Sequence, residues 1–115
     1  MERKVYYSRL LDFYGGLLPE KQQACMFQYY YDDLSLAEVS ENLGITRQGV
    51  RDFVKRGEAA LKKAESELKL VEKDDEKRRL RAGIAAELSA LAEDVPEEVA
   101  QRVRALVDSI NSMDV

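Results

Sequence analysis

Residues 35–56, SLAEVSENLGITRQGVRDFVKR, carry the signals for two short helices joined by a tight turn. Ser35 and Glu38 match the S-x-x-E capping box, in which a hydroxyl and a carboxylate each satisfy a free backbone N–H at a helix start. Gly44 tolerates the left-handed backbone that ends a helix, and Thr46 can cap the next one. The stretch therefore predicts one helix that ends near position 42 and a second that begins near position 47.

The apolar residues around Gly44 have the spacing of a helix-turn-helix module. Such a module needs a turn glycine, a small residue where the two helices touch, and apolar residues that face a core. Ser40 takes the small position, where alanine is commoner. The five predicted core positions are all apolar: Val39, Leu43, Ile45, Val50 and Phe53. Spacing, caps and glycine together predict a helix-turn-helix.

The second helix of this module would present a polar and mostly basic face. Arginine pairs with guanine, glutamine with adenine, and lysine or arginine neutralises phosphates along the groove walls. The free N–H groups at the helix start also favour a phosphate. We predict base contacts from Arg47, Gln48 and Arg51, and mainly phosphate contacts from the other basic residues. The full predicted nucleic-acid-binding set is Thr46, Arg47, Gln48, Arg51, Asp52, Lys55, Arg56, Lys62 and Lys63.

Apolar periodicity predicts helices along the whole chain, and hence an all-α fold. We expect a first helix over residues 3–14, ended by Gly15-Gly16, and a second that begins at Pro19. A continuous helix over residues 46–81 would be about 54 Å long, against roughly 35 Å for a compact globule of this size. We therefore expect it to break near Gly57 or Asp74-Asp75, or to project toward a partner. The predicted organisation is a helix-turn-helix core domain over residues 1–63 and a helical extension with an acidic C-terminal hairpin over residues 64–115.

Several single residues carry structural expectations rather than functional ones. Four tyrosines lie on the apolar stripes of the first two helices and are expected in the core: Tyr6, Tyr14, Tyr30 and Tyr31. Cys25 is expected to be a small, partly buried hydrophobic residue. Gly49 and Gly57 should each cost an interior helix about 1 kcal/mol, which predicts a soft recognition helix.

Composition limits the possible functions of this 115-residue chain. It has no histidine and one cysteine, which removes histidine proton shuttles, Cys/His zinc sites and an internal disulfide framework. No apolar stretch approaches the roughly 20 residues that span a bilayer. We therefore expect no catalytic residues, no metal, no cofactor, no membrane partner and a cytoplasmic location.

The net charge of −4 is unevenly distributed. Residues 47–63 have six basic and two acidic side chains, a local charge of +4, whereas residues 82–115 have two and seven, a local charge of −5. The positive charge therefore coincides with the predicted recognition helix, which favours a nucleic-acid partner in spite of the acidic total.

Residues 34–61 closely resemble the helix-turn-helix of the sigma-factor region that contacts the upstream promoter element. Over about residues 5–70 the chain resembles the YlxM family of small bacterial helix-turn-helix proteins, most specifically in LLDFY, LLPEKQ, YYYDDLSLAEV and TRQGVRDFVKR. The resemblance implies an all-helical fold like sigma region four. It also implies a gene neighbourhood shared with the signal recognition particle, and with it a role in protein targeting.

Two hypotheses follow from these observations. The first is a non-enzymatic regulator that binds double-stranded DNA through the helix-turn-helix. The second is an interaction module of the targeting pathway, which uses the same fold to bind a protein or a ribonucleoprotein such as the signal recognition particle and recognises no DNA sequence. A homodimer through the C-terminal helices is expected under the first hypothesis, because one helix-turn-helix rarely makes enough contacts to select a site.

Overall fold

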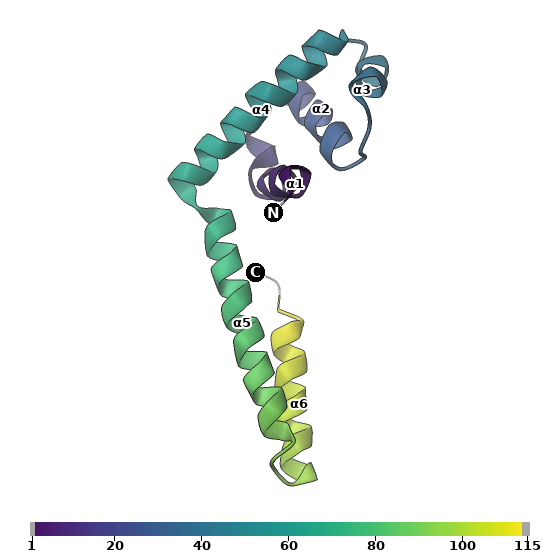
Figure 1. The fold of residues 1–115 in the computed structure, drawn as a ribbon. Coiled ribbons are helices and arrows are strands. Elements are labelled where there is room, and N and C mark those ends of the chain that lie inside the picture. The colour runs from purple at the N-terminus through teal and green to yellow at the C-terminus, as the bar shows by residue number, and fades with distance from the viewer. Residues whose placement is uncertain (1, 114–115) are drawn as a thin grey trace. The chain divides into compact units, whose positions relative to one another are not determined.

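The computed structural model describes residues 2–113, which form six α-helices and one 3-10 turn and contain no strand (Figure 1). The all-α prediction is confirmed. The helices are α1 (Arg3–Tyr14), α2 (Glu20–Tyr30), α3 (Leu36–Leu43), α4 (Arg47–Leu68), α5 (Leu70–Ala92) and α6 (Glu97–Asn111), with the 3-10 turn η1 at Gly15–Leu17. They divide into two compact units, residues 1–71 and residues 72–115.

The first unit is built around α4, which packs against α1, α2 and α3. Its core is one continuous cluster of apolar side chains: Tyr7, Leu10, Leu11, Tyr14, Leu18, Cys25, Met26, Tyr30, Val39, Val50, Val54, Leu61 and Val71. Leu61 and Val71 belong to this cluster, and Ala64 packs against it. The compact unit therefore extends eight residues beyond position 63, where we expected the core domain to end.

The helix-turn-helix has the caps that the sequence predicts. Ser35 and Glu38 form the reciprocal capping box at the start of α3, and Gly44 ends α3 with φ of 65° and ψ of 34°. The Thr46 hydroxyl oxygen accepts a hydrogen bond from the Gly49 backbone N–H at 2.9 Å. The Ser40 hydroxyl donates to the Ile45 carbonyl across the turn. This bond gives a physical reason for serine at a position where alanine is commoner.

The break between α4 and α5 lies at Lys69, so the prediction of a break near Gly57 or Asp74-Asp75 was wrong. Lys69 adopts the left-handed conformation, with φ of 55°. The next two N–H groups begin α5 and are satisfied by side chains: Leu70 donates to the Tyr14 hydroxyl at 3.0 Å and Val71 donates to the Glu65 carboxylate at 3.0 Å. The Tyr14 hydroxyl in turn donates to Glu65 at 2.6 Å. A contact from α1, 56 residues away, thus stabilises the break.

Gly57 has a packing role that the sequence does not predict. A Cβ atom at Gly57 would lie 2.8 Å from both the sulfur and the terminal methyl of Met26. Met26 is fully buried in α2, so it has little room to move. Glycine is therefore required here by the close approach of α2 and α4.

The aromatic predictions are confirmed in part. Tyr14 and Tyr30 are buried and Tyr6 is half-buried against the core, but Tyr31 is 45% exposed. Tyr31 follows the last residue of α2, where the chain leaves the core, and its hydroxyl donates to Asp12. Tyr7, which we did not place in the core, is buried instead. Cys25, expected to be partly buried, is wholly buried, and burial raises the pKa of its thiol.

The second unit is a helical hairpin in which the remainder of α5 returns as α6 (Figure 1). This is the segment for which the sequence predicts a C-terminal hairpin. The buried residues between the two helices are small: Ala92, Ala100 and Val103, with Leu88 and Val95 partly buried beside them.

Candidate nucleic-acid interface

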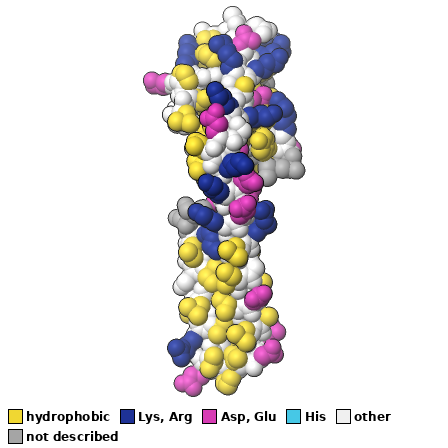
Figure 2. Space-filling model, turned by 90° about the vertical axis from the view of Figure 1, so that its left-hand side faces the viewer, with side chains coloured by type: hydrophobic (Ala, Val, Ile, Leu, Met, Phe, Trp, Pro, Cys, Tyr) yellow, Lys and Arg dark blue, Asp and Glu magenta, His cyan; other side chains and the backbone are white. Residues whose placement is uncertain are grey.

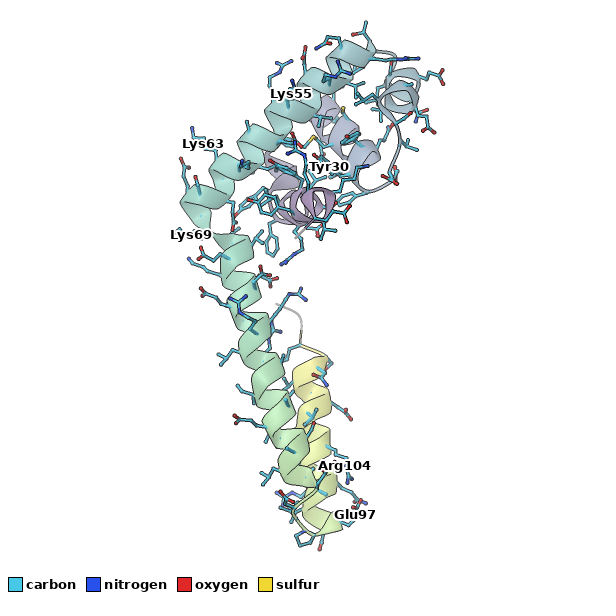
Figure 3. All side chains as sticks on the ribbon, in the orientation of Figure 1. Tyr30, Lys55, Lys63, Lys69, Glu97 and Arg104 are labelled. Atoms are coloured by element: carbon cyan, nitrogen blue, oxygen red, sulfur yellow. The ribbon has the colours of Figure 1, made fainter. Side chains whose placement is uncertain are left out.

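The basic face of α4 follows directly from helical spacing. Arg47, Arg51 and Lys55 are four residues apart and Lys62 is seven further on, so all four lie on one side of the helix. Gln48 flanks this side, and all five side chains are exposed. We call these five residues the α4 basic stripe. In Figure 3 Lys55 projects outward from α4, whereas Tyr30 lies between the helices.

The other predicted contact residues lie elsewhere or have structural partners. Arg56 follows Arg51 by five residues, a rotation of about 140°, and its guanidinium lies 5.7 Å from the centre of the Phe53 ring. Lys63 is seven residues after Arg56 and shares its side. Asp52 is half-buried and accepts a hydrogen bond from Gln48 at 3.0 Å. The nine predicted residues thus divide into the stripe, a second basic side, the Thr46 cap and one acceptor that orients Gln48.

A buried carboxylate lies beneath the stripe. The Glu58 side chain is about 10% exposed, and the Arg3 guanidinium donates to both of its oxygens at 2.9 Å. The Tyr30 hydroxyl also donates to it. Burial and this hydrogen bond to Glu58 raise the pKa of Tyr30, so the phenol remains a donor at neutral pH. Arg3 therefore compensates the charge of Glu58 beneath the α4 basic stripe, and the Tyr30 hydroxyl satisfies one of its oxygens.

A groove of about 440 Å³ opens beside the stripe, lined by residues from four helices. Arg51 and Lys55 of α4 form one side, and Arg3 of α1 and Tyr29 of α2 contribute to the others. Sequence reasoning missed Arg3 and Tyr29. Arg3 has no local signal, since its partner Glu58 is 55 residues away.

Within residues 2–113 none of Arg47, Arg51, Lys55 or Lys62 is joined to a carboxylate by an ion pair. In Figure 2 the Lys and Arg side chains gather over the part of the molecule that contains α4. The same described residues contain no group of three acidic or thiol side chains arranged for a metal ion. No helix among them is long and apolar enough to cross a bilayer. The arrangement can therefore supply unpaired positive charge along one exposed helix.

Comparison with known proteins identifies the family of this chain. The family model "Putative helix-turn-helix protein, YlxM / p13 like" of UPF0122 matches residues 1–102. The chain belongs to the UPF0122 family. Among the UPF0122 proteins similar to it, one from Bacillus mycoides (strain KBAB4) is 42% identical over 114 residues, which cover 99% of each chain. Another, from Bacillus thuringiensis (strain Al Hakam), is also 42% identical, over 92% of this chain and 96% of its own. UPF0122 membership confirms the family resemblance of residues 5–70 and extends it into α6.

Proposed function

We propose that this UPF0122 protein is a non-enzymatic regulator that binds double-stranded DNA through the α4 basic stripe. The observation that carries the proposal is the exposed row of Arg47, Arg51 and Lys55, which begins directly after the Gly44 turn. The buried Glu58 on the same helix is paired with Arg3 of α1. A recognition helix that enters the major groove places the residues of its first turns against base edges. Arg47, Gln48 and Arg51 occupy those turns.

The resemblance of residues 34–61 to the sigma-factor region supports the same mode of docking. Under this proposal, Lys55 and Lys62 contact phosphates further along the groove. Arg56 and Lys63, on the second side of α4, contribute only to the general positive field. The protein would act in the cytoplasm, where its DNA target lies.

Binding to a duplex selected from a randomised pool tests the proposal. Arg51→Ala is expected to lose about 1–3 kcal/mol, or roughly 5- to 150-fold in affinity, at the selected site. Arg56→Ala is the matched control, because it removes the same charge from the other side of α4 and should lose less. The logarithm of the affinity should fall against the logarithm of salt concentration with a slope of about −0.9 per phosphate contact. Absence of binding to every member of the pool at low salt refutes DNA recognition.

We keep one alternative, an interaction module that binds a protein or ribonucleoprotein of the targeting pathway. The hairpin favours it, because residues 82–115 carry −5 and expose large apolar side chains, neither of which suits a DNA backbone. Binding to signal recognition particle RNA or protein that survives Arg51→Ala, together with no binding to the duplex pool, would support this alternative.

A further inference from the structure

The hairpin of residues 72–115 has an unusually small core for its length. Apart from Val103, the buried apolar side chains in the described part of the hairpin are alanines: Ala85, Ala92 and Ala100. Units of this size rarely gain enough from burial alone and usually need a metal, a disulfide or a partner. Neither of the first two is available here, because the chain has no disulfide and the described residues form no metal cluster.

Many of the large apolar side chains of the hairpin are on its surface instead. Six of them in the described part of the hairpin are more than 40% exposed: Leu80, Ile84 and Leu91 of α5, Val99 and Leu106 of α6, and Met113 after α6. Figure 2 shows hydrophobic side chains gathered over this part of the molecule. The inverse arrangement, with alanines inside and leucines outside, indicates that the hairpin is half of a larger core.

On both α5 and α6, exposed large apolar residues come directly before buried residues in the sequence. Three exposed residues lie one position before a buried one: Ile84 before Ala85, Leu91 before Ala92, and Val99 before Ala100. One position is a rotation of about 100° in the same direction on each helix. Because α5 and α6 run antiparallel, equal rotations turn both stripes to the same face of the hairpin (Figure 1). We call this surface the hairpin face.

The charges at the two ends of the hairpin face are opposite. Lys77 is seven residues before Ile84 and extends the α5 stripe at one end of the hairpin, whereas Asp94 is exposed at the other end, in the turn between α5 and α6. Four basic residues fall within 77–81 and none that is acidic, whereas residues 87–98 contain five acidic residues and none that is basic. A second hairpin turned end to end would place each basic end against an acidic end.

We propose that the hairpin face binds the same face of a second copy of this chain, with the two hairpins antiparallel, to form a four-helix core. A two-fold arrangement satisfies both observations at once, because the apolar stripes meet and Lys77 of each copy lies near Asp94 of the other. The face is about 25 Å long between these residues and about 20 Å wide. Two copies therefore cover roughly 1,000 Å² in total, which is the lower limit for a biological interface.

Sedimentation equilibrium of the full chain without DNA tests the proposal independently of DNA binding. We expect a concentration-dependent species of twice the 13.1 kDa chain mass. Leu91→Glu should raise the dimer dissociation constant by at least about a hundredfold, because each dimer loses two leucine contacts and gains two carboxylates in apolar surroundings. Ala90→Glu, on the neighbouring exposed position that points away from the face, should leave it nearly unchanged. A chain that stays monomeric at all concentrations, or equal effects of the two variants, overturns the proposal.

Exchanging the charges of Lys77 and Asp94 tests the antiparallel arrangement. Both residues are exposed, so their substitution should leave the fold of the hairpin unchanged. Lys77→Glu alone and Asp94→Lys alone should each weaken the dimer, because each places like charges together at both ends. The double variant should restore the wild-type dissociation constant. In a parallel dimer Lys77 and Asp94 would each face their own copy, so like charges would meet before and after each exchange. Single variants that leave the dissociation constant unchanged therefore overturn the antiparallel arrangement.

Discussion

Replacing Lys69 with glycine is expected to stabilise the first unit, although glycine normally weakens helices. Lys69 holds φ of 55° between α4 and α5. A non-glycine residue in the left-handed conformation costs about 1–2 kcal/mol, and glycine offsets roughly 0.5–1 kcal/mol of this gain through its greater freedom in the unfolded chain. We therefore expect Lys69→Gly to raise the free energy of unfolding by about 0.5–1 kcal/mol.

Lys63→Gly is the matched control, since it makes the same exchange at an exposed position inside α4. There glycine should lower the free energy of unfolding by about 1 kcal/mol. The two variants should thus differ in sign and by about 1.5–2 kcal/mol. If the chain were helical through Lys69, both would be destabilised equally, and that outcome would refute the assignment of the break.

Urea unfolding followed by tyrosine fluorescence suits this measurement. The chain has six tyrosines and no tryptophan, and all six tyrosines lie between positions 6 and 31. The signal therefore reports the first unit alone. The slope against urea should be unchanged in both variants, because neither alters the surface buried on folding.

Three further predictions concern the core beneath α4. Tyr30→Phe should lower the free energy of unfolding by about 1.5–3 kcal/mol in the same urea assay, because buried Glu58 loses a charge-assisted hydrogen bond; a loss below about 0.5 kcal/mol would contradict the contact. Because the pKa of Tyr30 is raised in the folded state, only the unfolded chain releases the Tyr30 hydroxyl proton near pH 10. The free energy of unfolding is therefore retained below pH 10 and falls as the pH rises above it. The fall, measured by unfolding at several alkaline pH values, should be shallower in Tyr30→Phe. Gly57→Val should cost about 1–3 kcal/mol through overlap with Met26, and adding Met26→Ala should cost less than the sum of the two single changes.

The sequence predicts the local features of this fold well because their causes are local. The capping box at Ser35, the left-handed Gly44 and the Thr46 cap each depend on residues within four positions, and all three form as predicted. The all-α architecture and the C-terminal hairpin follow in the same way from periodicity.

The features that sequence analysis missed depend on contacts between distant residues. Nothing near Lys69 marks it as a break, because the stabilising hydroxyl comes from Tyr14 in α1. The need for glycine at position 57 is set by Met26 in α2, and composition alone suggests only a weakened helix. The same holds at the candidate interface, where Arg3 contributes through Glu58.

The pairing of Glu58 also changes the electrostatics inferred from composition. Residues 47–63 carry +4 by counting, but the two acidic residues in that count are not equivalent to exposed charges. Glu58 is buried against Arg3, a cation from outside the segment, and Asp52 accepts a hydrogen bond from Gln48. A phosphate that approaches the α4 basic stripe therefore meets its four basic side chains with little acidic charge beside them. The acidic net charge of the chain arises in residues 82–115, so it is compatible with a basic recognition helix. The acidic segment and the basic helix can therefore each make a different contact.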